Sequence, residues 1–257
     1  MFGNGFNRFV ASIPPVTKNL IIINLIIWLG EALFPRFASF VVNHLGLHYV
    51  GASHFNPVQL ITYMFIHDPY SPLHVIFNMF TLFMFGALIE RVWGSKRFFL
   101  FYFVCGIGAA FIQEIVWCFT WMNDYISALV RQNPGFTEEA IRAIIAKQQA
   151  AGDPEFLSSA AIMKNNLTTI GASGSVFGLL LAFAMMFPDR PMYFMFIPIP
   201  IKAKYLMIFW VVMEFFLGVA DFDMVAHFAH LGGALFGFLL ILYWKKKGTF
   251  YGGGGYY

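Results

Sequence analysis

Long apolar runs, separated by short polar, glycine- or proline-containing stretches, are the dominant pattern of the chain. A helix that crosses a bilayer needs about 20 mostly apolar residues. Stretches of suitable length predict six membrane-spanning helices, at residues 18–34, 72–90, 97–119, 172–188, 203–220 and 225–244. The segment 192–201 is also apolar, but Pro198 and Pro200 would interrupt a helix there. We therefore expect that segment to form a loop at the membrane surface.

The six spans predict an all-α membrane protein, a six-helix bundle whose chain has three parts. These are an N-terminal segment (1–17), a membrane domain (18–244) and a basic, glycine-rich tail (245–257). Two long connections, 35–71 and 120–171, follow the first and the third span, and both are expected on the outer side of the membrane.

The second long connection contains the signals of one further helix. Thr137 suits an N-cap, Glu138 and Glu139 suit a first helical turn, and Gly152 suits a helix end. Isoleucines at 141, 144 and 145 would share one face of this helix. We expect an amphipathic helix near the membrane interface, and packing is the simplest role for it.

The distribution of basic residues orients the predicted bundle. Lys and Arg are enriched in the cytoplasmic loops of membrane proteins. Eleven of them fall on the side of the termini: Arg8, Lys18, Arg91, Lys96, Arg97, Arg190, Lys202, Lys204, Lys245, Lys246 and Lys247. Five fall on the other side: Arg36, Arg131, Arg142, Lys147 and Lys164. Both termini are therefore expected in the cytoplasm, with the first span acting as an uncleaved signal anchor.

Composition narrows the class of protein further. Hydrophobic residues make up 59% of the chain and charged residues 11%, against about 25% charged in an average soluble domain. The mean hydropathy is +0.69. These values exclude a soluble globule, a disordered chain and a nucleic-acid-binding module. The two cysteines, Cys105 and Cys118, form no Cys-x-x-Cys motif and are expected to be apolar packing residues.

Polar groups within spans are costly and often mark a functional site, and the first cluster of them opens the fourth span. There, Ser173 stands between Gly171 and Gly174 at a predicted helix start, where free backbone N–H groups can stabilise an oxyanion. Gly174 and Gly178 also form a ridge of small residues that permits close helix contact. Taken alone, this cluster fits a nucleophile and a glycine-rich helix contact equally well.

A second cluster lies in the sixth span. His230, Gly233 and Gly237 share one helix face, and the glycines would let this face pack on the ridge beside Ser173. That packing brings an imidazole within reach of a hydroxyl, as activation of a serine requires. Phe177, one turn along from Ser173, could stack on His230, while His227 is expected to be an interface histidine.

A third cluster is the pair His74 and Asn78 in the second span. Their i, i+4 spacing places both side chains on one helix face. Both can donate hydrogen bonds, which suits an oxyanion hole or, alternatively, an interhelical hydrogen-bond pair. Together the three clusters supply a nucleophile, a base and oxyanion donors without a carboxylate.

These clusters, in this order and spacing, resemble the rhomboid family of intramembrane serine proteases. The likeness covers roughly residues 60–244 and rests on four motifs. They are His74-x-x-x-Asn78, the turn from Glu90 to Tyr102, Gly171-x-Ser173-Gly174, and Ala229-His230-x-x-Gly233-x-x-x-Gly237. Within the turn, Ser95 is expected to cap the third span.

The resemblance implies a role for each matching residue. Ser173 would be the nucleophile and His230 the general base, with His74, Asn78 and the Ser173 backbone N–H forming the oxyanion hole. The supporting residues would be Gly171, Gly174, Phe177, Gly233, Gly237 and His67. Two of these depart from the family pattern: Phe177 stands where Tyr is frequent, and His67 lies seven residues before His74, where members often have a histidine five before.

We therefore expect an endopeptidase that cuts transmembrane segments of other membrane proteins and needs no metal or cofactor. The resemblance implies the lipid bilayer and transmembrane substrates as partners, no nucleic acid, and a place in the bacterial inner membrane. The sequence leaves the physiological substrate and the oligomeric state open. The alternatives are a transporter or channel, a catalytically silent helix-binding protein, and a metalloprotease using His227 and His230, although His-Glu-x-x-His is missing.

Overall fold

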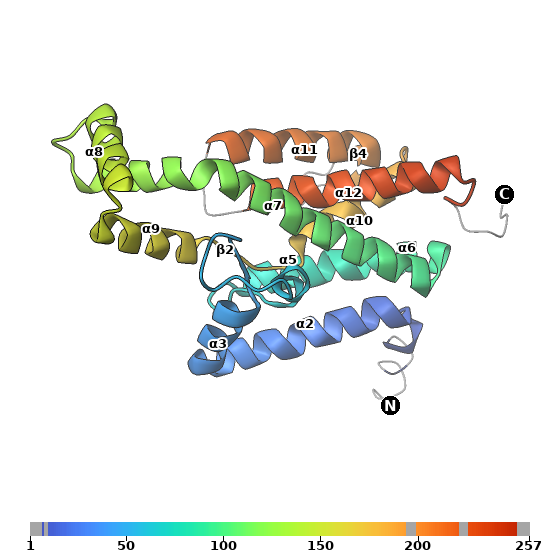
Figure 1. Ribbon diagram of the computed structural model, residues 1–257. Coiled ribbons are helices and arrows are strands. Elements are labelled where there is room, and N and C mark those ends of the chain that lie inside the picture. The colour runs from blue at the N-terminus through green and yellow to red at the C-terminus, as the bar shows by residue number, and fades with distance from the viewer. Residues whose placement is uncertain (1–6, 8–9, 194–198, 221–225, 251–257) are drawn as a thin grey trace.

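The computed structural model describes residues 7, 10–193, 199–220 and 226–250. Helices dominate this part of the chain, and most of the long ones run side by side in one bundle (Figure 1). The end of the predicted tail, with its run of glycines from Gly252 to Gly255, lies outside the described residues, as does most of 1–9.

Within the described residues, five helices are long and apolar enough to cross a membrane. They are α2 (Pro15–Leu33), the continuous helix Pro72–Trp93, α7 (Ser95–Gln132), α11 (Ala203–Ala220) and α12 (His227–Lys246). The helix Pro72–Trp93 consists of α5 (Pro72–Thr81), a π-helical turn η2 (Leu82–Gly86) and α6 (Ala87–Trp93). Five of the six predicted spans thus correspond to helices of spanning length, and the chain is a multi-pass membrane protein.

The fourth predicted span, 172–188, is a shorter helix. It forms α10 (Ser173–Met186), whose 14 residues extend roughly 21 Å, less than the ~30 Å of a bilayer core. Nine of its 14 residues are buried, and it contacts α5, α6, α7, α11 and α12. Because protein rather than lipid surrounds α10, its ends can lie inside the bundle without exposing backbone groups to hydrocarbon.

The turn between α6 and α7 is held by Glu90 and not by a serine cap. Gly94, with φ +77, is the N-cap residue of α7, and the Ser95 hydroxyl donates instead to Glu90 Oε1 at 2.7 Å. Glu90 Oε2 accepts from the Thr17 N–H at 2.7 Å and from the Thr17 hydroxyl at 2.8 Å. The expectation that Ser95 caps the third span was therefore wrong, because this buried carboxylate takes its hydroxyl.

The long connection after the third span is more helical than the sequence indicated. Helix α7 continues to Gln132, past the predicted end of the span at 119. The further helix predicted in this connection is confirmed as α8 (Glu138–Ala151). The Thr137 hydroxyl accepts from the Ala140 N–H at 3.2 Å, and Gly152 has φ +62. A further helix, α9 (Pro154–Asn166), was not predicted.

A separate apolar cluster explains why α7 extends beyond the bundle. Tyr125 and Ile126 of α7 are buried against residues of α8 and α9. The Tyr125 hydroxyl also lies 2.6 Å from the Ser159 hydroxyl of α9. We call this the outer cluster; its buried members are Tyr125, Ile126, Ile141, Ile145, Phe156 and Ala160. In Figure 1, helices α8 and α9 stand at one end of the bundle.

Short elements form two of the remaining connections. The first connection contains α3 (Pro35–Leu45), α4 (Gln59–Thr62), the 3₁₀ turn η1 (Tyr63–Phe65) and β1 (Leu47–His48), which pairs antiparallel with β2 (Thr168–Thr169). The segment expected as a loop, 192–201, belongs in its described part to a hairpin of β3 (Pro191–Tyr193) and β4 (Pro200–Lys202). Strand pairing satisfies backbone groups that a loop would expose, so the expectation of a loop was wrong for these described residues, whereas 194–198 lie outside the described part of the chain.

Candidate active site

Ser173 is the first residue of α10, and the backbone before it has a conformation that favours glycine. Gly171 has φ +123, and its N–H donates to the Tyr63 carbonyl at 3.0 Å. A Cβ atom at Gly171 would lie only 2.8 Å from His74 Nε2 and 3.8 Å from Ser173 Oγ. Gly171 therefore permits both the turn into α10 and the close approach of His74. The first N–H groups of α10 have no partner within the helix.

His230 of α12 faces Ser173 across the contact between the two helices. His230 Nε2 lies 2.8 Å from Ser173 Oγ, although 57 residues separate them in the chain. The ring of Phe177 stacks on the imidazole with a centroid distance of 4.6 Å and an interplanar angle of 3°. Ser173 is half-buried and His230 is buried. The predicted approach of hydroxyl and imidazole, and the predicted stacking, are both present.

Glycines bring the helices this close. A Cβ atom at Gly233 would lie 1.9 Å from the Gly174 carbonyl oxygen, so α10 and α12 touch through their backbones. A Cβ atom at Gly178 would lie 2.3 Å from Cys105 Sγ, and one at Gly237 would lie 3.0 Å from the same atom. The predicted contact between the glycines of the two helices is confirmed. The contribution of α7 through the buried Cys105 was not foreseen.

His74 presents its Nε2 atom to the site. The Asp68 N–H donates to His74 Nδ1 at 3.4 Å, and in a neutral imidazole the other nitrogen then carries the proton. His74 Nε2 is thus a donor directed at the space beside Gly171 and Ser173. Asn78 lies one turn along α5, and its Nδ2 donates to the His74 carbonyl at 2.9 Å. This described bond ties Asn78 to its own helix, while the second proton of its amide remains for another acceptor.

His67 lies behind His74 in the connection before α5. It is fully buried, and its ring contacts the His74 ring edge-on at a centroid distance of 5.0 Å. Burial lowers the pKa of His67 to about 3, so this imidazole is neutral at physiological pH. Neither ring nitrogen has a hydrogen-bond partner among the described residues. His67 therefore contacts His74 as a neutral aromatic ring.

A carboxylate that the sequence reading did not assign to the site completes this group. Glu214 Oε2 of α11 lies 2.9 Å from His230 Nδ1 and 2.7 Å from His227 Nδ1. The three side chains are 14%, 11% and 6% exposed, respectively. The sequence carried one signal of this, because a glutamate inside a predicted span is costly and often marks a functional site.

The same three side chains form the group of possible metal ligands found among the described residues, with ligand atoms within 4.8 Å of one another. Two ligands of a tetrahedral Zn²⁺ lie roughly 3.3 Å apart, given Zn–N bonds of about 2.0–2.1 Å. The oxygen–nitrogen distances of 2.7 and 2.9 Å at Glu214 are shorter and fit direct hydrogen bonds. Glu214, His227 and His230 would have to separate before they could hold a metal ion.

Comparison with protein families identifies the chain. The model of the Rhomboid domain matches residues 54–119 and 150–247, well over half of the sequence. The chain belongs to the rhomboid family. Members of this family are generally intramembrane serine proteases. A search of curated proteins finds no match.

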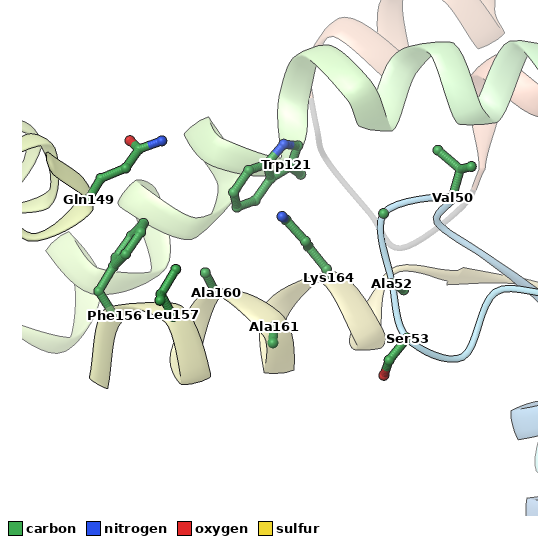
Figure 2. Close-up of a pocket in the computed structure, with 11 residues that line it drawn as sticks. Val50, Ala52, Ser53, Trp121, Gln149, Phe156, Leu157, Ala160, Ala161 and Lys164 are labelled. Carbon is green, nitrogen blue, oxygen red and sulfur yellow. The ribbon is translucent and has the colours of Figure 1, made fainter. Parts of the chain in front are cut away.

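The match to the rhomboid family divides at the outer cluster. The unmatched residues 120–149 comprise the end of α7, which leaves the bundle, and most of α8. A cavity of about 440 Å³ lies beside this unmatched segment, between α7, the end of α8, α9 and the loop that carries Val50 and Ser53 (Figure 2). Trp121 and Lys164 face each other at its edge, with Lys164 Nζ 4.3 Å from the indole centroid. The residues of the candidate active site, including Ser173 and His230, do not line this cavity.

Proposed function

We propose that this rhomboid is a serine endopeptidase that cleaves transmembrane segments of other membrane proteins, with Ser173 as nucleophile and His230 as general base. The observation that carries the proposal is the 2.8 Å contact between Ser173 Oγ and His230 Nε2 at the start of α10. A nucleophile within hydrogen-bond reach of an oriented base is the arrangement that activates serine. The stacked Phe177 ring supports it by fixing the imidazole plane.

The first half of the reaction forms an acyl-enzyme. His230 Nε2 accepts the proton of Ser173 Oγ as that oxygen attacks the scissile carbonyl. Negative charge develops on the carbonyl oxygen, where donors directed at one point stabilise the transition state. We assign this role to His74 Nε2–H, the Ser173 backbone N–H and the free amide proton of Asn78. His230 then gives its proton to the departing amine.

In the second half the same residues release the acyl group, and the proton transfers run in the opposite direction. Water takes the place of the amine, loses a proton to His230 Nε2 and attacks the ester carbonyl. The proton returns to Ser173 Oγ as the new carboxylic acid leaves. Apart from this water and the substrate, neither half needs a group from outside the chain. A substrate helix must unwind to expose its carbonyl, so small or helix-breaking residues near the cleaved bond should favour cleavage.

We further propose that α10 is a sixth membrane-embedded helix and that both termini face the cytoplasm of a bacterial inner membrane. The excess of Lys and Arg on the side of the termini supports this orientation. Under it, Ser173 at the start of α10 lies toward the outer side. The polar groups of the site gather at that end instead of lining a path through the bundle, so no observation favours the transporter alternative.

The test is cleavage of a membrane-spanning reporter in proteoliposomes that contain the purified protein. Ser173→Ala should lower the cleavage rate at least ~10³-fold, because the acyl-enzyme can no longer form. Ser175→Ala is the matched control: Ser175 is fully buried and donates to the Tyr102 carbonyl at 2.8 Å, so its loss should leave the chemistry intact. Undiminished cleavage by Ser173→Ala would refute the assignment.

A further inference from the structure

The carboxylate of Glu214 is placed to act on the reaction through His230. We propose that Glu214 is a positioning residue that extends the Ser173–His230 pair to a Ser–His–Glu relay, with His227 holding the carboxylate in place. This inference rests on the proposed protease function and adds to it a third residue. The three members come from three helices, α10, α11 and α12, so only the packed bundle can assemble them.

The hydrogen bonds of Glu214 fix the proton on the correct nitrogen of His230. An ionised carboxylate can only accept hydrogen bonds, so the Nδ1 atom of His230 that lies 2.9 Å away must donate. The neutral imidazole then has its lone pair on Nε2, the atom that faces Ser173 Oγ at 2.8 Å. Without the carboxylate both tautomers would be available, and one of them presents a proton to the serine instead of a lone pair.

The carboxylate also stabilises the charge that appears during catalysis. When His230 Nε2 takes the serine proton, the imidazole becomes a cation whose Nδ1–H already faces Glu214 Oε2. Both side chains are shielded from solvent, at 11% and 14% exposure, so their attraction is weakly screened. Two other titratable rings lie near His230, namely His74 and His227, whose ring centroid is 6.3 Å from that of His230, and either would repel the cation if it were itself protonated. Glu214 is the negative group described at this position.

His227 and Phe177 restrict the remaining freedom of the pair. His227 Nδ1 donates to the same oxygen of Glu214 at 2.7 Å and approaches it from the first turn of α12. Phe177 covers one face of the His230 ring. With two donors on one carboxylate oxygen and one ring face covered, the imidazole keeps the plane that directs Nε2 at Ser173. This gives His227 a definite task in place of the interface role expected for it.

A purely structural role for Glu214 is the competing explanation. The buried residues of α11, namely Ala203, Leu206 and Met207, all lie in its first five residues, whereas Glu214 is farther along the helix. The bonds from Glu214 to α12 could therefore serve only to hold that part of α11. A structural tether would change the stability of the fold, whereas a positioning residue changes kcat in a fold that remains stable.

The experiment compares Glu214→Gln with Glu114→Gln in the proteoliposome cleavage assay, alongside wild type and Ser173→Ala. Glu114 is a matched control because it is another buried glutamate of a span. It lies away from the site, where its carboxylate accepts a hydrogen bond of 2.8 Å from the Val50 N–H. We expect Glu214→Gln to lower kcat roughly 10²–10⁴-fold with KM and the thermal midpoint nearly unchanged, as for an amide in place of a relay carboxylate. Glu114→Gln should keep kcat within about twofold, and Glu214→Asp should recover part of the loss.

Each outcome bears on one proposal. A kcat for folded Glu214→Gln within about threefold of wild type, while Ser173→Ala is inactive, would overturn the role of Glu214 and leave the protease assignment standing. Failure of wild type to cleave would count against the proposed function itself. Should Glu214→Gln not fold, proton NMR of the wild type decides: a strongly downfield Nδ1–H resonance at acidic pH, lost in His230→Ala, supports the relay, and its absence overturns it.

Discussion

The bundle around α10 and the outer cluster of α7, α8 and α9 are held together by different means. In the bundle, helices touch backbone to backbone through glycines, as where Gly233 meets the Gly174 carbonyl. In the outer cluster, contact is made by side chains such as Ile145 and Phe156, and helices start at ordinary polar caps. The Asp153 carboxylate, for example, accepts from the Phe156 N–H at 2.9 Å.

This difference indicates how each region tolerates change. A lipid-embedded bundle gains little from burying apolar surface, because lipid is equally apolar, so close packing and internal polar bonds decide its geometry. The outer cluster buries apolar side chains in the usual way, and residues 120–149 lie outside the match to the Rhomboid domain. We expect the bundle to be sensitive to single atoms and the outer cluster to vary without affecting Ser173.

Among the changes that test the difference between the two regions, the largest expected effect comes from adding one methyl group to the bundle. In Gly233→Ala the new Cβ would lie 1.9 Å from the Gly174 carbonyl oxygen, a backbone atom that cannot turn away. The helices must separate, and a misplacement of about 1 Å between catalytic groups costs on the order of 10²-fold in rate. We expect this loss in cleavage, with a destabilisation of about 1–3 kcal/mol measured by thermal unfolding in detergent.

The matched control for that variant lies in the outer region. Gly135→Ala adds the same methyl group where nothing lies within 4 Å of the new atom. Its cleavage rate and thermal midpoint should equal those of wild type. Equal losses in both variants would show that the comparison between the regions is wrong.

An intermediate effect is expected when the pH is lowered, because protonation of His67, in the connection before α5, changes the free energy of unfolding. Burial lowers the pKa of His67 to about 3, whereas an unfolded histidine titrates near 6.5. The unfolded chain therefore binds more protons below pH 6.5, and the stability that His67 contributes is present above pH 6.5 and lost as the pH falls toward 3. At pH 5 the loss is about 2 kcal/mol.

The measurement compares thermal midpoints of wild type and His67→Phe at pH 7.5 and pH 5. Phe keeps an aromatic ring against His74 but does not titrate. Three other titratable residues lie near this position and remain in both proteins: Glu31, His74 and Asp68. The Glu31 Oε2 atom accepts from the His67 N–H at 3.4 Å. Between pH 7.5 and pH 5 the thermal midpoint should fall less in His67→Phe than in wild type. An equal fall in both proteins would refute the claim that His67 is a buried neutral imidazole.

The smallest effect is expected in the outer cluster. Ile145→Val removes one methyl group from a side chain that is 4% exposed, at a cost of about 0.5–1.5 kcal/mol. Because the outer cluster is separate, hydrogen exchange should accelerate in α8 and α9 while cleavage stays at the wild-type rate. A parallel fall in cleavage would show that the two regions are coupled.

The same contrast explains which features could be predicted from the sequence. Helix α8 followed from Thr137 and Gly152, since caps act within a few residues. The approach of Ser173 to His230 followed from glycine spacing on two helix faces, combined with the family motifs. The role of Glu214 could not be predicted in this way, because its partners lie on another helix. The sequence of α11 does not indicate which face of α12 the helix will contact. The extension of α7 was missed for a similar reason, since Tyr125 and Ile126 are buried by helices that come later in the chain.

The account of the active site depends on Ser173 being an activated nucleophile, and covalent labelling with a fluorophosphonate probe tests this most directly. Wild type, Ser173→Ala, His230→Ala and Ser175→Ala would be labelled in mild detergent and the modified residue mapped. We predict modification of wild type and Ser175→Ala at Ser173, with no labelling of Ser173→Ala or His230→Ala. Unlabelled wild type with a normal thermal midpoint, or undiminished labelling of Ser173→Ala, would contradict it.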